Sequence, residues 1–244
     1  MSIAAKPAEG ASPSLIELRD VTKVYGHGEA AVHALRGVDL VVDSGEFLAI
    51  MGPSGSGKST AMNIMGCLDT PTAGSYHFFG HEVSGFDRDQ RALLRRNYLG
   101  FVFQGYNLLA RTSALDNVEL PLIYQGVKAD ERRQLAMQAL SRVGLEGRES
   151  HDPSELSGGQ QQRVAIARAI VGKPDVLLAD EPTGNLDTER SREIMDLLTN
   201  LNKTDNMTIL MVTHEPDMAE YAHRIVTFVD GQVASDKRNT AMVA

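Results

Sequence analysis

The stretch GPSGSGKST spans Gly52 to Thr60 and directly follows the apolar run Phe47 to Met51. It satisfies the pattern G-x-x-x-x-G-K-[ST], which forms a phosphate-binding loop where a strand ends and a helix starts. Glycine tolerates positive φ, so the backbone amides of such a loop can approach phosphate oxygens closely. A glycine-rich turn that only links strand to helix is the plain alternative. The predicted nucleotide-binding residues of the loop are Gly52, Ser54, Gly55, Ser56, Gly57, Lys58, Ser59 and Thr60.

Lys58 and Ser59 carry the side-chain chemistry expected of this loop. We predict that the Lys58 ammonium lies between the β- and γ-phosphates as a point charge, and that the Ser59 hydroxyl binds Mg²⁺. The helix that starts near Lys58 directs the positive end of its dipole at the same phosphates. The loop therefore predicts a nucleotide with Mg²⁺ as the ligand.

Strand and helix patterns alternate around the loop. The run Val176 to Ala179 is continuously apolar, which is typical of a strand buried on both faces, and another strand is expected at Thr208 to Val212. Helical spacing between such strands predicts an α/β protein with a parallel sheet. The helix after the loop should carry Met62, Met65 and Leu68 on one face.

Two regions differ from this alternation. Between about Asn107 and Ser154 the helical patterns dominate, which predicts a helical lobe. Near the end of the sequence, Asp230-Gly231 separates the apolar stretches Ile225 to Val229 and Gln232 to Ala234, and this arrangement predicts a tight hairpin.

Composition limits the possible classes of protein. The chain has 244 residues, 42% of them hydrophobic, and a formal net charge of −8, so it can bury a core but has no general attraction for nucleic acid. Its single cysteine, Cys67, cannot form an internal disulfide, and no apolar run reaches the roughly 18 residues of a membrane span. We therefore expect the reducing cytosol as the compartment.

The segment VLLADEP, Val176 to Pro182, places two acids at the end of the buried strand. Asp180 is the predicted Mg²⁺ ligand. Glu181 is the predicted general base, because a second carboxylate beside the metal ligand can take a proton from the water that attacks the γ-phosphate. An ordinary acidic helix start is the alternative for this pair.

The segment LSGGQQQRVAIARAI, Leu156 to Ile170, completes a set of motifs whose order resembles the ATP-binding-cassette (ABC) ATPases. The resemblance implies an α/β P-loop NTPase fold, RecA-like with a mostly parallel sheet, plus an antiparallel β subdomain and a helical subdomain. It implies ATP and Mg²⁺ as cofactors and ATPase activity. The motifs, in chain order, are Tyr25, Gly52 to Thr60, Gln104, Leu156 to Gln160, Val176 to Glu181, Asn185-Leu186-Asp187 and His214.

The resemblance also implies that two chains close head to tail over two ATP molecules. The LSGGQ residues Ser157, Gly158, Gly159 and Gln160 would then contact the γ-phosphate held by the partner's loop, and Asp187 would cross the same interface. The family often has Ser or Ala where this chain has Asn185. For an isolated S-G-G, a capped helix start is the plain alternative.

Three single residues take roles from the resemblance. Tyr25 would stack on adenine, although a lone Tyr is more often a half-buried strand residue. Gln104 would contact Mg²⁺ and the attacking water, with an exposed loop amide as its alternative. His214 would contact the γ-phosphate and hold Glu181 in line, with a structural histidine as its alternative.

The expected organisation is one ABC ATPase domain over residues 15–236, with flexible tails at 1–14 and 237–244. Within the domain, residues 15–103 and 156–236 would form the RecA-like core with its antiparallel β subdomain, and 104–155 the helical subdomain.

The sequence resembles, over Gly66 to Gly74 and Leu99 to Leu122, the macrolide-export and lipoprotein-release subfamily. This implies a subunit on the cytoplasmic face of the inner membrane that powers a separate permease, for export or mechanotransmission, through a surface near Gln104 to Tyr124. A soluble ABC ATPase acting on nucleic acid or ribosomes is the alternative, and a nucleotide-sensing adaptor is a third. Cargo specificity would reside in the permease.

One further motif argues for a different nucleotide. Asn202-Lys203-Thr204-Asp205 matches the N-K-x-D that reads guanine in GTPases, but here it ends a helix and precedes a strand. We interpret it as a chance match.

Overall fold

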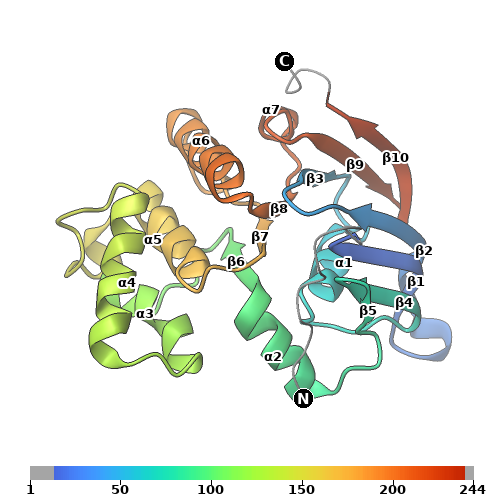
Figure 1. Cartoon of the computed structure of the whole chain (residues 1–244). Coiled ribbons are helices and arrows are strands. Elements are labelled where there is room, and N and C mark those ends of the chain that lie inside the picture. Colours follow the sequence, from blue (N-terminus) through green and yellow to red (C-terminus); the bar gives the residue numbers. More distant parts are fainter. Residues whose placement is uncertain (1–13, 240–244) are drawn as a thin grey trace. The chain divides into compact units, whose positions relative to one another are not determined.

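The structure is a computed structural model that describes residues 14–239 and divides into two compact units (Figure 1). The first unit comprises the described residues up to Arg95 and from Leu210 onward, and the second comprises Arg96–Ile209. Most of the two tails expected at 1–14 and 237–244 lies outside the described residues, which leave out 1–13 and 240–244, whereas Lys237 and Arg238 belong to the last strand. Within the described part of the chain, no helix is both long and apolar enough to cross a membrane.

The first unit contains an antiparallel sheet with the strand order β2-β1-β4-β5. Ile16 of β1 pairs with Val42 of β2 on one side and with Phe78 of β4 on the other, and all three side chains are buried. This sheet is the expected antiparallel β subdomain. Its strands are β1 (Ile16–Tyr25), β2 (Val32–Val42), β4 (Ala73–Phe78) and β5 (His81–Glu82), and a short 3-10 turn (Gly28–Ala30) precedes β2.

The first unit also holds the strands that carry the loop. Strand β3 (Phe47–Met51) runs parallel to β9 (Arg224–Val229), and β9 pairs antiparallel with β10 (Gln232–Arg238). The hairpin predicted at Asp230-Gly231 is confirmed. Strand β10 continues to Arg238, two residues beyond the expected domain end at Asp236, because Lys237 and Arg238 still pair with β9. The helices of this unit are α1 (Lys58–Met65) and α7 (Pro216–Ala219).

Helix α1 is shorter than its apolar pattern indicates. Met62 and Met65 are buried, but Leu68 is 48% exposed, so the predicted three-residue face is wrong at its last position. The helix ends at Met65, and Cys67 adopts a left-handed φ of 53°. Because the chain leaves the helix there, helical periodicity no longer decides which way Leu68 points.

The second unit combines two parallel strands with a group of packed helices. Strand β6 (Leu99–Phe103) pairs with β7 (Val176–Asp180), and helix α5 contacts β6 as well as α3 and α4. Helix α5 thus packs against helices of the lobe expected at 104–155, although α5 itself lies after residue 155 in the sequence. The helices are α3 (Ala114–Tyr124), α4 (Ala129–Arg142), α5 (Gly158–Ile170), α6 (Thr188–Asp205) and a 3-10 turn (Pro153–Glu155). Helix α2 (Arg88–Tyr98) and strand β8 (Thr208–Val212) each include residues of both units.

Asn202 explains the GTPase-like motif as a structural feature. It lies in the last turns of α6 and is 4% exposed, and its side-chain amide donates a hydrogen bond of 2.7 Å to the Met207 carbonyl. The amide therefore closes the turn between α6 and β8. The motif thus ends a helix and precedes a strand, as the sequence indicates, and its interpretation as a chance match stays a prediction.

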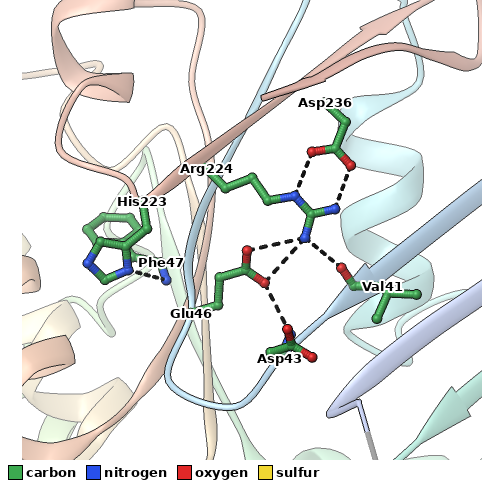
Figure 2. A network of polar contacts seen from close by, with 7 residues as sticks. All are labelled: Val41, Asp43, Glu46, Phe47, His223, Arg224 and Asp236. Atoms are coloured by element: carbon green, nitrogen blue, oxygen red, sulfur yellow. Dashed lines mark hydrogen bonds and ion pairs between the residues drawn. The ribbon is translucent and has the colours of Figure 1, made fainter. Parts of the chain in front are cut away.

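Arg224 ties three segments of the first unit together (Figure 2). At the start of β9, its Nε donates to Asp236 Oδ1 at 2.6 Å, and its Nη1 donates to the Val41 carbonyl at 2.9 Å and to Glu46 Oε1 at 3.2 Å. One guanidinium thus joins β10, the end of β2 and the turn before β3. This turn leads into β3, which carries the phosphate-binding loop.

The hydrogen bond from Arg224 lowers the pKa of Asp236, which makes this contact sensitive to acid. Because the folded pKa lies below the unfolded value of about 3.9, the stabilisation is complete above that value and is lost as the pH falls through the folded pKa. We expect Asp236→Asn to cost about 0.5–1 kcal/mol of unfolding free energy at pH 7, since the contact is partly exposed, and much less at pH 2 to 3.

Urea unfolding at both pH values measures this difference. Asp196→Asn on the exposed side of α6 is the matched control. Equal losses for Asp236→Asn at both pH values would show that the ionised pair does not stabilise the unit.

Candidate nucleotide site

The loop between β3 and α1 has the predicted glycine-dependent shape. Gly52 has a φ of 142° and Gly57 a φ of 99°. A Cβ at Gly52 would lie 2.1 Å from the Phe228 carbonyl oxygen, and one at Gly57 would lie 2.6 Å from the Ala34 carbonyl oxygen. Because the backbones of β2 and β9 pass so close behind the loop, any larger residue at these positions would displace it.

The β9–β10 turn supports the loop from behind. The amide of Gly231 donates to the Ser56 carbonyl at 3.1 Å, and the Gly231 carbonyl accepts from the Arg36 amide at 2.8 Å. The sequence indicated Asp230-Gly231 only as a hairpin turn. Its contribution to the loop could not be read from the motif, because Ser56 and Gly231 are far apart along the chain.

The inside of the loop presents a cation and hydrogen-bond donors that can bind a phosphate group. Lys58 is 8% exposed, and its ammonium donates to the carbonyls of Gly52 and Pro53, both at 2.9 Å, so the cation is held within the loop. The Ser56 hydroxyl is buried and has no hydrogen-bond partner in the described structure. Gly57 gives α1 no side-chain cap. Uncapped helix amides, an unpaired hydroxyl and an enclosed cation are the groups that bind phosphate.

Tyr25 lies at the end of β1, where 41% of its surface is exposed. Its hydroxyl donates to Asp69 Oδ2 at 2.7 Å. Desolvation and this hydrogen bond raise the pKa of Tyr25, so the hydroxyl remains a donor. Burial alone would raise the pKa of Asp69, but hydrogen bonds from Lys23 and Tyr25 lower it overall. Tyr25 is thus a fixed, partly exposed ring.

His214 is exposed and follows β8 in the first unit. The amide of its neighbour Thr213 donates to the Ile50 carbonyl of β3 at 3.2 Å, and β3 ends one residue later, where the loop begins. The first unit therefore brings His214 to the strand end that carries the loop.

Asp180, Glu181 and Gln104 lie at the paired ends of strands β6 and β7. Asp180 ends β7 and pairs with Phe103, the last residue of β6, so Gln104 and Glu181 both follow directly on paired strand ends. Glu181 has a φ of 46°, a left-handed conformation that costs a non-glycine residue roughly 1–2 kcal/mol. Backbone strain of this kind is concentrated at functional sites.

Two residues outside the predicted site fix this edge. The Asn185 side-chain amide donates to the Gln104 carbonyl at 2.8 Å, and the fully buried Gln162 of α5 donates to the Pro182 carbonyl at 2.6 Å. The sequence marked Asn185 only as a departure from the family pattern and gave no signal for Gln162. Both hold the segment that follows Glu181.

The LSGGQ residues form a complete helix cap within this chain. Ser157 Oγ accepts from the Gln160 amide at 3.3 Å, and Gln160 Oε1 accepts from the Ser157 amide at 2.9 Å, so the pair makes a capping box at the start of α5. Gly159 packs against Arg190, since a Cβ there would lie 3.2 Å from Arg190 Cδ. Asp187 caps α6 by accepting from the Arg190 amide at 2.9 Å.

The predicted site residues thus fall into two groups, one in each unit. The first unit holds Tyr25, the loop from Gly52 to Thr60, and His214. The second holds Gln104, Asp180 and Glu181 together, with Ser157, Gly158, Gly159, Gln160 and Asp187 at the starts of α5 and α6. Hydroxyl, carboxylate and amide oxygens of Ser59, Asp180 and Gln104 are ligands that suit Mg²⁺.

A glycine-rich loop between strand and helix, with a pair of acids at the end of another buried strand, defines a P-loop nucleotide-binding protein of α/β class. The chain belongs to the ABC transporter family, whose family model matches residues 35–184. It is therefore an ABC-type ATPase domain.

Relatives and solved structures agree with this assignment. The chain is 53% identical over 222 residues to the macrolide export ATP-binding/permease protein MacB of Marinobacter nauticus, and 52% identical over 226 residues to the pyoverdine export ATP-binding/permease protein PvdT of Pseudomonas aeruginosa. These alignments cover 91% and 92% of this chain but 34% of each relative, so the chain spans about a third of their length.

A dimeric ATP-binding cassette bound to ADP and Pi, in a post-hydrolysis state, superposes on the chain with a TM-score of 0.85 and 45% identity. That match covers 92% of this chain and 98% of the other. The fold predicted from the motifs is confirmed.

Proposed function

We propose that this chain is the ATP-binding and ATP-hydrolysing subunit of an ABC transporter and powers a membrane permease of the export or mechanotransmission type. The observation that carries the proposal is the loop interior, where an enclosed Lys58 ammonium and an unpaired Ser56 hydroxyl can bind phosphate oxygens. The high identity to proteins named as export ATP-binding/permease proteins supports the transport role.

The predicted residues divide the work of binding and hydrolysis in this proposal. Lys58 leaves the loop carbonyls for the β- and γ-phosphates, and Glu181 accepts a proton from the attacking water while His214 and Gln104 position the water and the γ-phosphate. Ser59, Asp180 and Gln104 would hold Mg²⁺, which supplies charge neutralisation for the phosphate oxygens when it is bound. The left-handed backbone of Glu181 is consistent with a functional position at this turn.

A second copy of the chain would complete each site. Ser157, Gly158, Gly159 and Gln160 would offer the start of α5 to the nucleotide on the partner's loop, and Asp187 would contact the same interface. The dimeric state of a similar cassette with ADP and Pi supports this arrangement. The hydroxyl of Ser157 would then contact phosphate in addition to capping its helix.

The contact with the permease would lie within residues 104–124, at the C-terminal end of α3. Ile123 is 49% exposed and Tyr124 is 72% exposed, so this helix end presents apolar surface. Such a contact would hold the chain peripherally at the cytoplasmic face of the inner membrane.

The permease contact has a direct test. The Glu181→Gln chain, held on MgATP, should co-purify from mild-detergent extracts of native membranes with a protein that has membrane spans and a large extracytoplasmic domain. Tyr124→Asp in the same background should reduce that recovery at least tenfold, whereas Val32→Asp, an exposed position on β2, should not. Recovery of only soluble or nucleic-acid partners would favour the alternative of a soluble ABC ATPase.

A further inference from the structure

Three residues of the first unit form a polar cluster around Tyr25. Lys23 Nζ donates to Asp69 Oδ1 at 2.6 Å and to the Thr70 carbonyl at 2.8 Å, and the Tyr25 hydroxyl donates to the other oxygen of Asp69 at 2.7 Å. The Lys23 ammonium also lies 4.8 Å from the centroid of the Tyr25 ring. The Asp69 carboxylate therefore binds both the Lys23 ammonium and the hydroxyl of Tyr25, whose ring lies below that ammonium.

The cluster leaves Tyr25 fixed but accessible. Lys23 is 9% exposed, whereas Tyr25 is 41% exposed. The hydroxyl is anchored to Asp69 and the ammonium lies over the ring, so the opposite ring face is the one that a ligand would use. A tyrosine at the end of a strand would otherwise sample several rotamers, and a ligand that used it would lose affinity by ordering it.

We propose that Lys23 and Asp69 are positioning residues that hold Tyr25 as a platform for the adenine base, with the base on the ring face opposite the ammonium. The inference rests on the proposed function, in which the loop from Gly52 to Thr60 binds the triphosphate. Base-on-aromatic stacking and a cation over an aromatic ring are both favourable contacts, and here they share one ring.

The position of Asp69 supports this role. It follows α1 by four residues, and α1 starts at Lys58 of the phosphate loop. Its carboxylate therefore ties the ring of Tyr25, on β1, to the helix whose other end faces the phosphates. The ring is thus linked to the segment that follows the loop helix, an arrangement that suits one ligand with a base at one end and phosphates at the other.

The test separates the base from the phosphates. Dissociation constants are measured for MgATP and for magnesium tripolyphosphate, which has no base, in the Glu181→Gln background. Lys23→Met and Asp69→Asn should each raise the dissociation constant for MgATP about three- to tenfold and leave that for tripolyphosphate unchanged. Lys23→Arg, which keeps the cation, should restore most of the affinity. Lys128→Met and Asp196→Asn, both exposed, are the matched controls.

Tyrosine emission gives a second readout, because the chain has six tyrosines and no tryptophan. MgATP should quench part of the emission and tripolyphosphate should not, and Tyr25→Leu should abolish the difference. Equal weakening of both ligands in Lys23→Met and Asp69→Asn would assign the cluster to the stability of the loop and overturn the inference. Equal affinity of the Glu181→Gln chain for both ligands would also overturn the inference, but phosphate binding by the loop would still stand. Binding of neither ligand would overturn the proposed function as well.

Discussion

Glu181→Gln is expected to lower kcat for ATP hydrolysis by about 10²- to 10⁴-fold, the usual contribution of a general base. An amide has nearly the shape of the carboxylate but does not accept a proton from water. The backbone of Glu181 is already left-handed, and glutamine meets the same conformational cost, so the turn should keep its form. Phosphate release and equilibrium binding of MgATP, measured on the same preparation, separate the loss of chemistry from a loss of binding.

Glu131→Gln is the matched control, since it makes the same chemical change at an exposed position in the first turn of α4. It should hydrolyse ATP at the rate of the unaltered chain. If Glu181→Gln retained that rate, Glu181 would not be the base, and the acid pair would need another explanation.

Lys58→Ala is expected to weaken MgATP binding about 10- to 100-fold, which corresponds to the loss of one charge-assisted contact of about 1.5–3 kcal/mol. The residue is buried and donates to two loop carbonyls, so its ammonium is held at the centre of the loop. Calorimetry with MgATP in the Glu181→Gln background gives the dissociation constant without interference from turnover.

The loop itself also has to be monitored in this variant. Removal of the ammonium leaves the Gly52 and Pro53 carbonyls without this donor, so a modest loss of unfolding free energy is expected beside the loss of affinity. Lys128→Ala, at the exposed start of α4, should change neither quantity. Unchanged MgATP affinity in a folded Lys58→Ala chain would contradict the phosphate role of Lys58.

The features that the sequence predicted well are those that short segments determine. The loop from Gly52 to Thr60 combines strand end, glycines and helix start within a few residues, and Asp230-Gly231 specifies a hairpin by itself. Strands such as Thr208–Val212 are buried throughout, so a run of apolar residues was enough to locate them. Local backbone preference and burial act together in these segments.

The features that the sequence could not supply depend on contacts between distant residues. Tyr25 and Asp69 are 44 positions apart, and Asn185 and Gln104 are 81 apart, so no spacing rule connects them. The pattern extends α1 to Leu68, whereas the helix ends at Met65 and the left-handed Cys67 follows. The roles of Gln104, His214 and the LSGGQ residues in catalysis stay predictions, since they depend on a nucleotide and on a second chain.

The most direct test of the central claim is phosphate release from ATP by the unaltered chain, measured over a range of chain concentrations with and without Mg²⁺. We expect release that requires Mg²⁺, with a rate per chain that rises with concentration until every chain is paired. Absence of phosphate release at every concentration would contradict the claim that this chain hydrolyses ATP. A rate per chain that does not depend on concentration, in a chain shown to be monomeric, would contradict the claim that two chains share each site.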